Sequence, residues 1–95
     1  MTGPVERTVL ITNKRGLHAR ASAKFVTLAS GQPVEVSVRR DDGGAADAVT
    51  GTSIMGLMML GAAKGDSITI SASGDGAEAA VACLCELVEA KFGED

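Results

Sequence analysis

The chain is organised around the stretch Asn13-Lys14-Arg15-Gly16-Leu17-His18-Ala19-Arg20-Ala21-Ser22, which holds the only histidine in the sequence. An alternating apolar run precedes it, and a helical pattern follows it as far as Ala29. The stretch therefore predicts a strand, a glycine turn and the start of a helix, in that order. A histidine at such a junction lies where the first N–H groups of a helix point outward and can bind an anion. We expect the functional site at this junction.

The composition predicts one small domain, spanning residues 1–95, with an aromatic-poor core. Hydrophobic residues make up 45% of the chain, but the only aromatic ones are Phe25 and Phe92. The core must therefore be built from Val, Ile, Leu, Met and Ala. A net charge of −3 and the lack of Trp and Tyr argue against nucleic-acid binding, which favours a basic face and aromatic stacking platforms.

We expect neither a membrane span nor a secretory signal in this sequence. No apolar run approaches the roughly 18–20 residues that a span requires, and residues 1–8 lack the apolar core of a signal peptide. We therefore expect a soluble, cytoplasmic protein without membrane insertion, and nothing in the sequence demands more than a monomer.

The two cysteines, Cys83 and Cys85, lie one residue apart in a helical pattern, so their side chains point to roughly opposite sides. That placement disfavours a disulfide and a shared metal. The single histidine has no cluster of further ligands for zinc. We expect no metal and no cofactor, and a small metal or thiol module based on the two cysteines is a minor alternative.

Apolar periodicity and turn residues predict seven elements. The expected strands cover 5–12, 34–39, 46–50 and 67–72, the helices cover 19–30, 52–61 and 75–92, and a hairpin turn covers 41–44. Four residues of the last helix form an apolar stripe: Ala77, Val81, Leu84 and Val88. This order favours an open-faced sandwich with an antiparallel or mixed sheet and one layer of helices.

His18 has the chemistry of a phosphoryl acceptor. A neutral imidazole is a good nucleophile near pH 7. Arg20 can offer a charged fork to phosphoryl oxygens, and the first amides of the helix near Ala19 add donors. Spacing alone leaves a second interpretation open, in which His18 is an ordinary surface histidine at a helix start.

Ser53 and the apolar residues after it allow two interpretations each. Ser53 is a good N-cap, worth about 0.5–2 kcal/mol, or a phosphorylation site beside an apolar surface. The apolar residues after it would cover more than one face of a short helix: Ile54, Met55, Leu57, Met58, Met59 and Leu60. Either some of them are exposed as an adaptable docking surface, or all of them pack into the core.

Taken together, four motifs resemble HPr, the histidine phosphocarrier family of the bacterial phosphoenolpyruvate-dependent phosphotransferase system. The motifs are Gly16-Leu17-His18-Ala19-Arg20, Ala23-Lys24-Phe25-Val26, the run Thr52–Gly61 and Gly65-Asp66. The resemblance covers nearly the whole chain. It implies an α+β fold, an open-faced β-sandwich in which a four-stranded antiparallel sheet carries three helices on one face, in the order βαββαβα.

The resemblance also implies roles for particular residues. His18 falls on the histidine phosphorylated at Nδ1, and Arg20 on the arginine that contacts the phosphoryl group. Ser53 falls on the serine that HPr kinase/phosphorylase modifies in many bacteria. The partner surface for enzyme I and enzyme II-type acceptors falls on Ile54, Met55 and Met58. Ala21 replaces the family's usual proline, so we expect it to influence partner binding.

Two functions from different classes follow. The first is a phosphocarrier, not itself an enzyme, that takes a phosphoryl group from phospho-enzyme I on His18 and passes it to enzyme II-type proteins. The second is a regulatory binding module of a nitrogen- or carbon-control chain, which docks to regulators through Ser53 or the apolar surface and is not involved in sugar transport.

Overall fold

The computed structural model describes residues 3–41 and 48–94. Its elements follow the predicted order: β1 (Val5–Leu10), α1 (Ala19–Ser30), β2 (Val36–Arg40), β3 (Val49–Thr50), α2 (Ile54–Met59), β4 (Ser67–Ala72), α3 (Ala77–Glu89) and a short 3₁₀ turn, η1 (Lys91–Gly93). Within these ranges, no helix has the length and apolar character that crossing a membrane requires.

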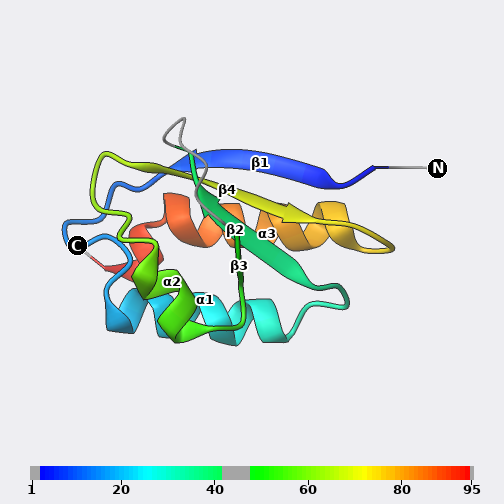
Figure 1. The fold of residues 1–95 in the computed structure, drawn as a ribbon, viewed down its shortest axis with the longest axis horizontal. Helices are drawn as coiled ribbons and strands as arrows, with labels where there is room; N and C mark the ends of the chain where they lie inside the picture. The colour runs from blue at the N-terminus through cyan, green and yellow to red at the C-terminus, as the bar shows by residue number, and fades with distance from the viewer. Residues whose placement is uncertain (1–2, 42–47, 95) are drawn as a thin grey trace.

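The four strands form one sheet in the order β1-β4-β2-β3, and every neighbouring pair is antiparallel. The three helices lie together on one face of this sheet (Figure 1). The predicted open-faced sandwich with an antiparallel sheet is therefore confirmed. The register pairs Val9 with Ile68 and Val38 with Ile70, which turns the apolar side chains of the strands toward the helices.

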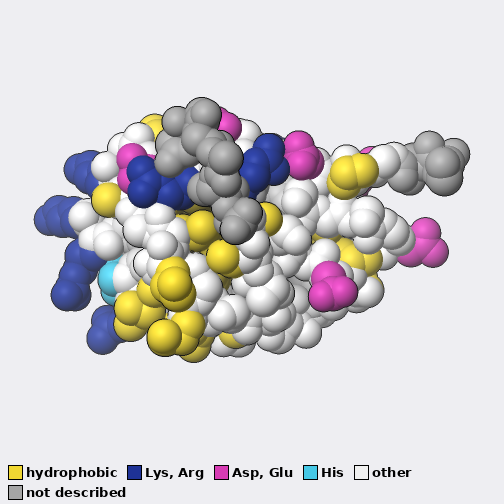
Figure 2. Space-filling model, viewed as in Figure 1, with side chains coloured by type: hydrophobic (Ala, Val, Ile, Leu, Met, Phe, Trp, Pro, Cys, Tyr) yellow, Lys and Arg dark blue, Asp and Glu magenta, His cyan; other side chains and the backbone are white. Residues whose placement is uncertain are grey.

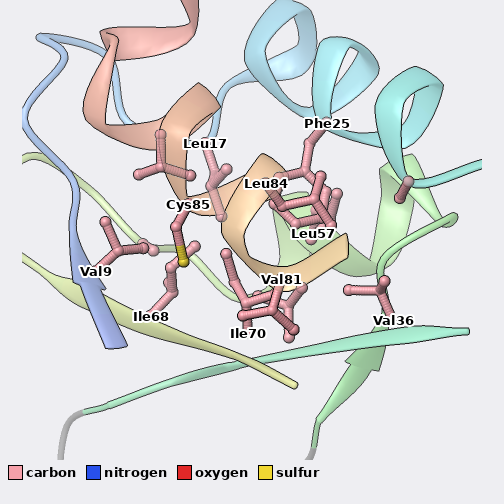
Figure 3. Packing of buried hydrophobic residues seen from close by; sticks show 14 of the residues in the cluster. Val9, Leu17, Phe25, Val36, Leu57, Ile68, Ile70, Val81, Leu84 and Cys85 are labelled. Atoms are coloured by element: carbon pink, nitrogen blue, oxygen red, sulfur yellow. The ribbon is translucent and has the colours of Figure 1, made fainter. Parts of the chain in front are cut away.

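The core fills the space between the sheet and the helix layer (Figure 3). Phe25 from α1 and Phe92 from η1 are almost completely buried, together with Ile68, Ile70 and Leu84. The predicted α3 stripe is also buried along its whole length. Because the period of 3.6 residues brings these side chains onto one face, α3 can cover β1 and β4.

Several predicted boundaries differ from the structure. β1 ends at Leu10 rather than residue 12, because the Asp66 amide donates to the Ala63 carbonyl in the turn before β4 and no longer to β1. The strand predicted over 46–50 comprises only Val49–Thr50 among the described residues, and most of the predicted 41–44 turn lies outside them. α3 ends at Glu89, before the predicted residue 92, because Lys91 and Phe92 leave the helical conformation.

Candidate functional site

The loop before His18 is fixed by close backbone packing. Gly16 has a φ of 60°, and a Cβ atom there would lie 2.5 Å from the Ala62 carbonyl oxygen. The next amide, that of Leu17, donates to the same oxygen at 3.0 Å. The buried Asn13 amide group donates to the Gly16 carbonyl at 2.9 Å. Only glycine fits this approach, which holds the loop against the segment that follows α2.

His18 occupies the N-cap position of α1 with an extended backbone, and its side chain does not cap the helix. The first helical bond is donated by the Ser22 amide to the His18 carbonyl. The Ser22 hydroxyl also donates to the Leu17 carbonyl at 3.2 Å, which fixes the chain just before the histidine. The amides of Ala19, Arg20 and Ala21 belong to the first turn, whose N–H groups have no partner within a helix. The α1 N-terminus therefore presents donors beside the imidazole.

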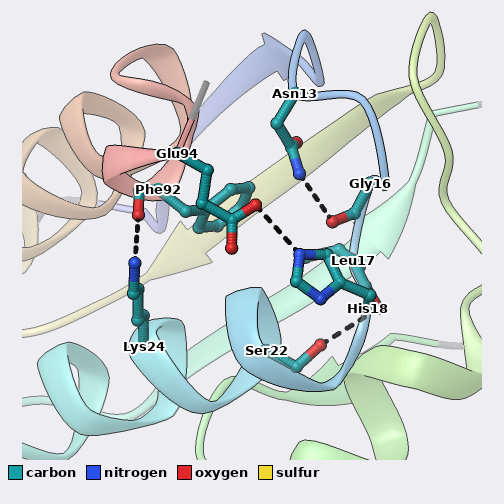
Figure 4. Close-up of polar contacts among 8 residues, drawn as sticks. All are labelled: Asn13, Gly16, Leu17, His18, Ser22, Lys24, Phe92 and Glu94. Atoms are coloured by element: carbon teal, nitrogen blue, oxygen red, sulfur yellow. Dashed lines mark hydrogen bonds and ion pairs between the residues drawn. The ribbon is translucent and has the colours of Figure 1, made fainter.

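The imidazole of His18 is oriented by Glu94. Its Nε2 lies 2.9 Å from the Glu94 Oε1 (Figure 4). Because a carboxylate only accepts hydrogen bonds, this contact assigns a proton to Nε2, and in the neutral tautomer of the ring the lone pair is then on Nδ1. The hydrogen bond from His18 holds the pKa of the Glu94 carboxyl below its ordinary value, and the charge of Lys24 acts in the same direction.

A left-handed turn brings Glu94 to the histidine. The three residues of η1, Lys91, Phe92 and Gly93, have φ values of 58°, 56° and 74°. Non-glycine residues in this region cost about 1–2 kcal/mol each. The buried Phe92 side chain and a 2.7 Å hydrogen bond from the Lys24 ammonium to the Phe92 carbonyl hold the turn in place. The backbone strain is therefore balanced by packing beside the site.

Four cationic side chains surround the imidazole. A shallow depression of about 410 Å³ is lined by Lys14, Arg15, His18, Arg20, Lys24, Gly93 and Glu94. Lys and Arg side chains gather at this end of the molecule around the histidine (Figure 2). Four cations face one carboxylate here, although the whole chain carries a net charge of −3. Such a site favours a multiply charged anion over a neutral ligand.

The start of α2 is built differently. Ser53 is its N-cap, and its hydroxyl oxygen accepts a hydrogen bond from the Gly56 amide at 2.9 Å. The predicted N-cap is therefore confirmed.

The apolar residues of α2 divide between core and surface. Leu57 and Leu60 are buried, whereas four neighbours are exposed and form what we call the α2 patch: Ile54, Met55, Met58 and Met59. The hypothesis that all of these residues pack into the core is wrong, because the helix has only one face toward α1 and the sheet. The patch lies near the cationic end of the molecule in Figure 2.

The structure separates the remaining candidates. Arg20 is exposed and lines the depression with His18. Ala21 is completely buried in the first turn of α1, so it offers no side-chain surface to a partner, and its influence on partner binding stays a prediction. Cys83 and Cys85 are free thiols, and the described residues include no group of three His, Cys, Asp or Glu that could hold a metal ion.

Comparisons with known proteins agree on one family. The family model described as "PTS HPr component phosphorylation site" matches residues 5–90. A phosphocarrier protein HPr of Neisseria meningitidis is 44% identical over 95% of this chain and 97% of its own length. The phosphocarrier protein NPr of Escherichia coli is 42% identical over 96% of this chain and 98% of its own.

A solved structure of HPr from Thermoanaerobacter tengcongensis superposes with a TM-score of 0.85 at 43% identity, covering 96% of this chain and 98% of that chain. A second structure from that organism, described as an HPr dimer, has a TM-score of 0.70 at 41% identity and covers 99% of this chain. The names of these relatives and the folds of the solved structures thus indicate the same family.

Proposed function

The chain belongs to the HPr family of phosphocarrier proteins of the phosphotransferase system, and from this we propose that His18 carries the phosphoryl group. One observation carries the assignment. His18 lies in a cationic depression at the open N-terminus of α1, and its Nε2 is already bonded to Glu94, so Nδ1 is the nitrogen left for an electrophile.

In the proposed transfer, Nδ1 attacks the phosphorus atom of phospho-enzyme I. The new P–N bond forms as the P–N bond of the donor histidine breaks. Arg20 and the first amides of α1 balance the negative charge on the phosphoryl oxygens. Glu94 keeps the Nε2–H proton in place and balances the positive charge that develops on the ring. The same steps in reverse pass the group to an enzyme II-type acceptor, with no metal or cofactor of this chain involved.

We assign docking of these partners to the α2 patch. A partner must reach the Nδ1 atom and cover the cationic depression at the same time, so its contact surface has to extend over neighbouring elements. α2 packs on α1, and its exposed thioethers are flexible enough to fit several partners. We also propose that the chain is a cytoplasmic protein and acts as a monomer. Light scattering of the purified protein tests the oligomeric state.

The deciding experiment is phosphorylation by enzyme I and phosphoenolpyruvate. We expect an acid-labile, base-stable phosphoprotein that is absent from the His18→Ala variant. A characterised HPr phosphorylated by the same enzyme I serves as the positive control. Because relatives of both the HPr and the NPr type match this chain, enzyme I from both kinds of system should be tried. An unlabelled wild-type chain beside a labelled control would contradict the proposal.

A second candidate function is regulatory docking controlled at Ser53. A phosphate on its hydroxyl would lie at the α2 N-terminus, where the helix amides favour negative charge, and would place that charge beside the α2 patch. Pull-downs with wild type, Ser53→Asp and Ser53→Ala would compare the proteins that each captures. Equal profiles for the three chains would remove this function.

A further inference from the structure

The α2 patch concentrates methionine to an unusual degree. The chain has four methionines, and three of them lie on this helix of six residues. We propose that Met55, Met58 and Met59 are oxidation sites: hydroperoxides convert them to sulfoxides, and the oxidised patch binds phosphotransfer partners less well. The effect on transfer rests on the docking role proposed above for the α2 patch.

The exposure of the thioethers predicts their order of reaction. Met59 is 80% exposed, Met55 70% and Met58 42%. Peroxide therefore reaches Met59 and Met55 most readily, whereas Met58 is less exposed and should react later.

Oxidation of the patch should leave the fold intact. The buried side chains here are those of Leu57 in α2 and of Leu60, its C-cap, and neither contains sulfur. The helix start is held by the bond from the Gly56 amide to the Ser53 hydroxyl, which a sulfoxide does not disturb. Oxidation therefore changes a surface and not the core.

The two cysteines are less accessible to an oxidant than the methionines of the α2 patch. Thiols usually react with peroxide first, but only as thiolates. Cys85 is buried, and burial raises the pKa of its thiol, so little thiolate forms near neutral pH. Cys83 is half-buried on α3. Among the described sulfur atoms, the thioethers of the α2 patch are thus the most accessible to an oxidant.

The oxidation of a thioether needs hydrogen peroxide as its only other reactant. The thioether sulfur attacks one peroxide oxygen, the O–O bond breaks, a sulfur–oxygen bond forms and water leaves. Sulfur loses two electrons and peroxide gains them. A thiol-dependent methionine sulfoxide reductase reverses the change. The new oxygen is a strong acceptor, and a docked partner would bury it without a hydrogen-bond donor, which corresponds to about a tenfold loss of affinity or more.

The test treats the full chain with hydrogen peroxide, removes the excess with catalase and maps the products by mass spectrometry. We expect one added oxygen on Met59 and Met55 before Met58. Steady-state phosphorylation by enzyme I should then show a KM raised about tenfold, with the circular dichroism spectrum unchanged. Treatment with the two methionine sulfoxide reductases, one for each sulfoxide epimer, and a thiol reductant should restore the original KM.

Two variants make the assignment specific. In the Met55→Leu, Met58→Leu, Met59→Leu chain, KM should be the same before and after peroxide, with its own untreated sample as reference. The Cys83→Ser, Cys85→Ser chain should respond to peroxide as the wild type does. An oxidised wild type with unchanged KM, or an oxidised leucine variant with raised KM, would overturn the inference and leave the carrier role intact. Failure of the untreated chain to be phosphorylated would contradict the carrier role itself.

Discussion

The two helices that begin at candidate phosphorylation sites solve the same problem in opposite ways. At α2, the Ser53 hydroxyl accepts the Gly56 amide at 2.9 Å, so the helix start is satisfied from within the chain. At α1, His18 occupies the equivalent position without capping, and its side chain turns to Glu94 instead. A capped start contributes stability, whereas an open start retains donors for an incoming anion. The difference separates the proposed transfer site at His18 from a structural cap at Ser53, where we propose regulatory modification.

The largest effect is expected when α1 receives a serine N-cap like the one that α2 has. The His18→Ser variant should lose all enzyme I-dependent phosphohistidine, because its hydroxyl cannot form a P–N bond. It should also be about 1 kcal/mol more stable than His18→Ala, because serine caps a helix and alanine does not. Labelling and urea denaturation measure the two effects. Equal stability of the serine and alanine variants would mean that the α1 amides already have partners.

Variants of Arg20 test whether phosphoryl transfer at the uncapped N-terminus of α1 requires a guanidinium group. Arg20→Ala should lower kcat/KM for phosphoryl transfer about 10–100-fold, because a charge-assisted hydrogen bond is worth about 1.5–3 kcal/mol. Its exposed side chain carries no core packing, so the thermal midpoint should stay unchanged. Arg20→Lys keeps the charge without the fork and should fall between the two. A fully active alanine variant would assign the role to the neighbouring cations Lys14, Arg15 and Lys24.

Variants of Ser53 test how much the N-cap of α2 contributes to stability. Ser53→Ala should lower the free energy of unfolding by about 1 kcal/mol, since the Gly56 amide loses its acceptor. Ser53→Asp retains an acceptor and should stay close to wild type in urea denaturation. Phosphorylation of His18 should proceed in both variants. A stable alanine variant would show that the cap is not needed to hold so short a helix.

The smallest effect concerns Glu94 and pH. Its hydrogen bond with His18 lowers the pKa of the folded carboxyl from an ordinary value of 4.5. Because the carboxyl has a lower pKa in the folded chain than in the unfolded chain, the carboxylate stabilises the fold above the ordinary pKa. This contribution is lost as the pH falls through the lowered pKa of the folded state. In the Glu94→Gln variant, the free energy of unfolding should depend less on pH over this range. Urea midpoints measured above and below the ordinary pKa would check it, and parallel curves for the two chains would contradict it.

Local patterns predicted much of the fold. The alternation from Ser67 to Ala72 marks both ends of β4, and the α3 stripe identifies the buried face of that helix. These features repeat over a few residues, so one sequence is enough to detect them. His18 at the start of a helix and the Ser53 cap are also local features.

The Glu94 contact could not be predicted in this way. Glu94 lies 76 residues from His18 in the sequence, and the apolar pattern of α3 continues through Phe92 although the helix does not. The left-handed turn is set by burial of Phe92 and by the bond from Lys24, both of which are tertiary. The only local signal is Gly93, directly before Glu94. Similarly, the burial of Ala21 results from tertiary packing. The substitution of alanine for the proline that is usual in the family does not predict it.

The turn that brings Glu94 to the histidine has a practical consequence for handling the protein. The chain enters β1 at one end of the molecule and leaves η1 beside His18 at the other (Figure 1). A polyhistidine tag added at the C-terminus would place extra imidazoles next to His18, where they could accept the phosphoryl group or compete for Glu94. Purification through an N-terminal tag keeps foreign nucleophiles away from the reaction being measured.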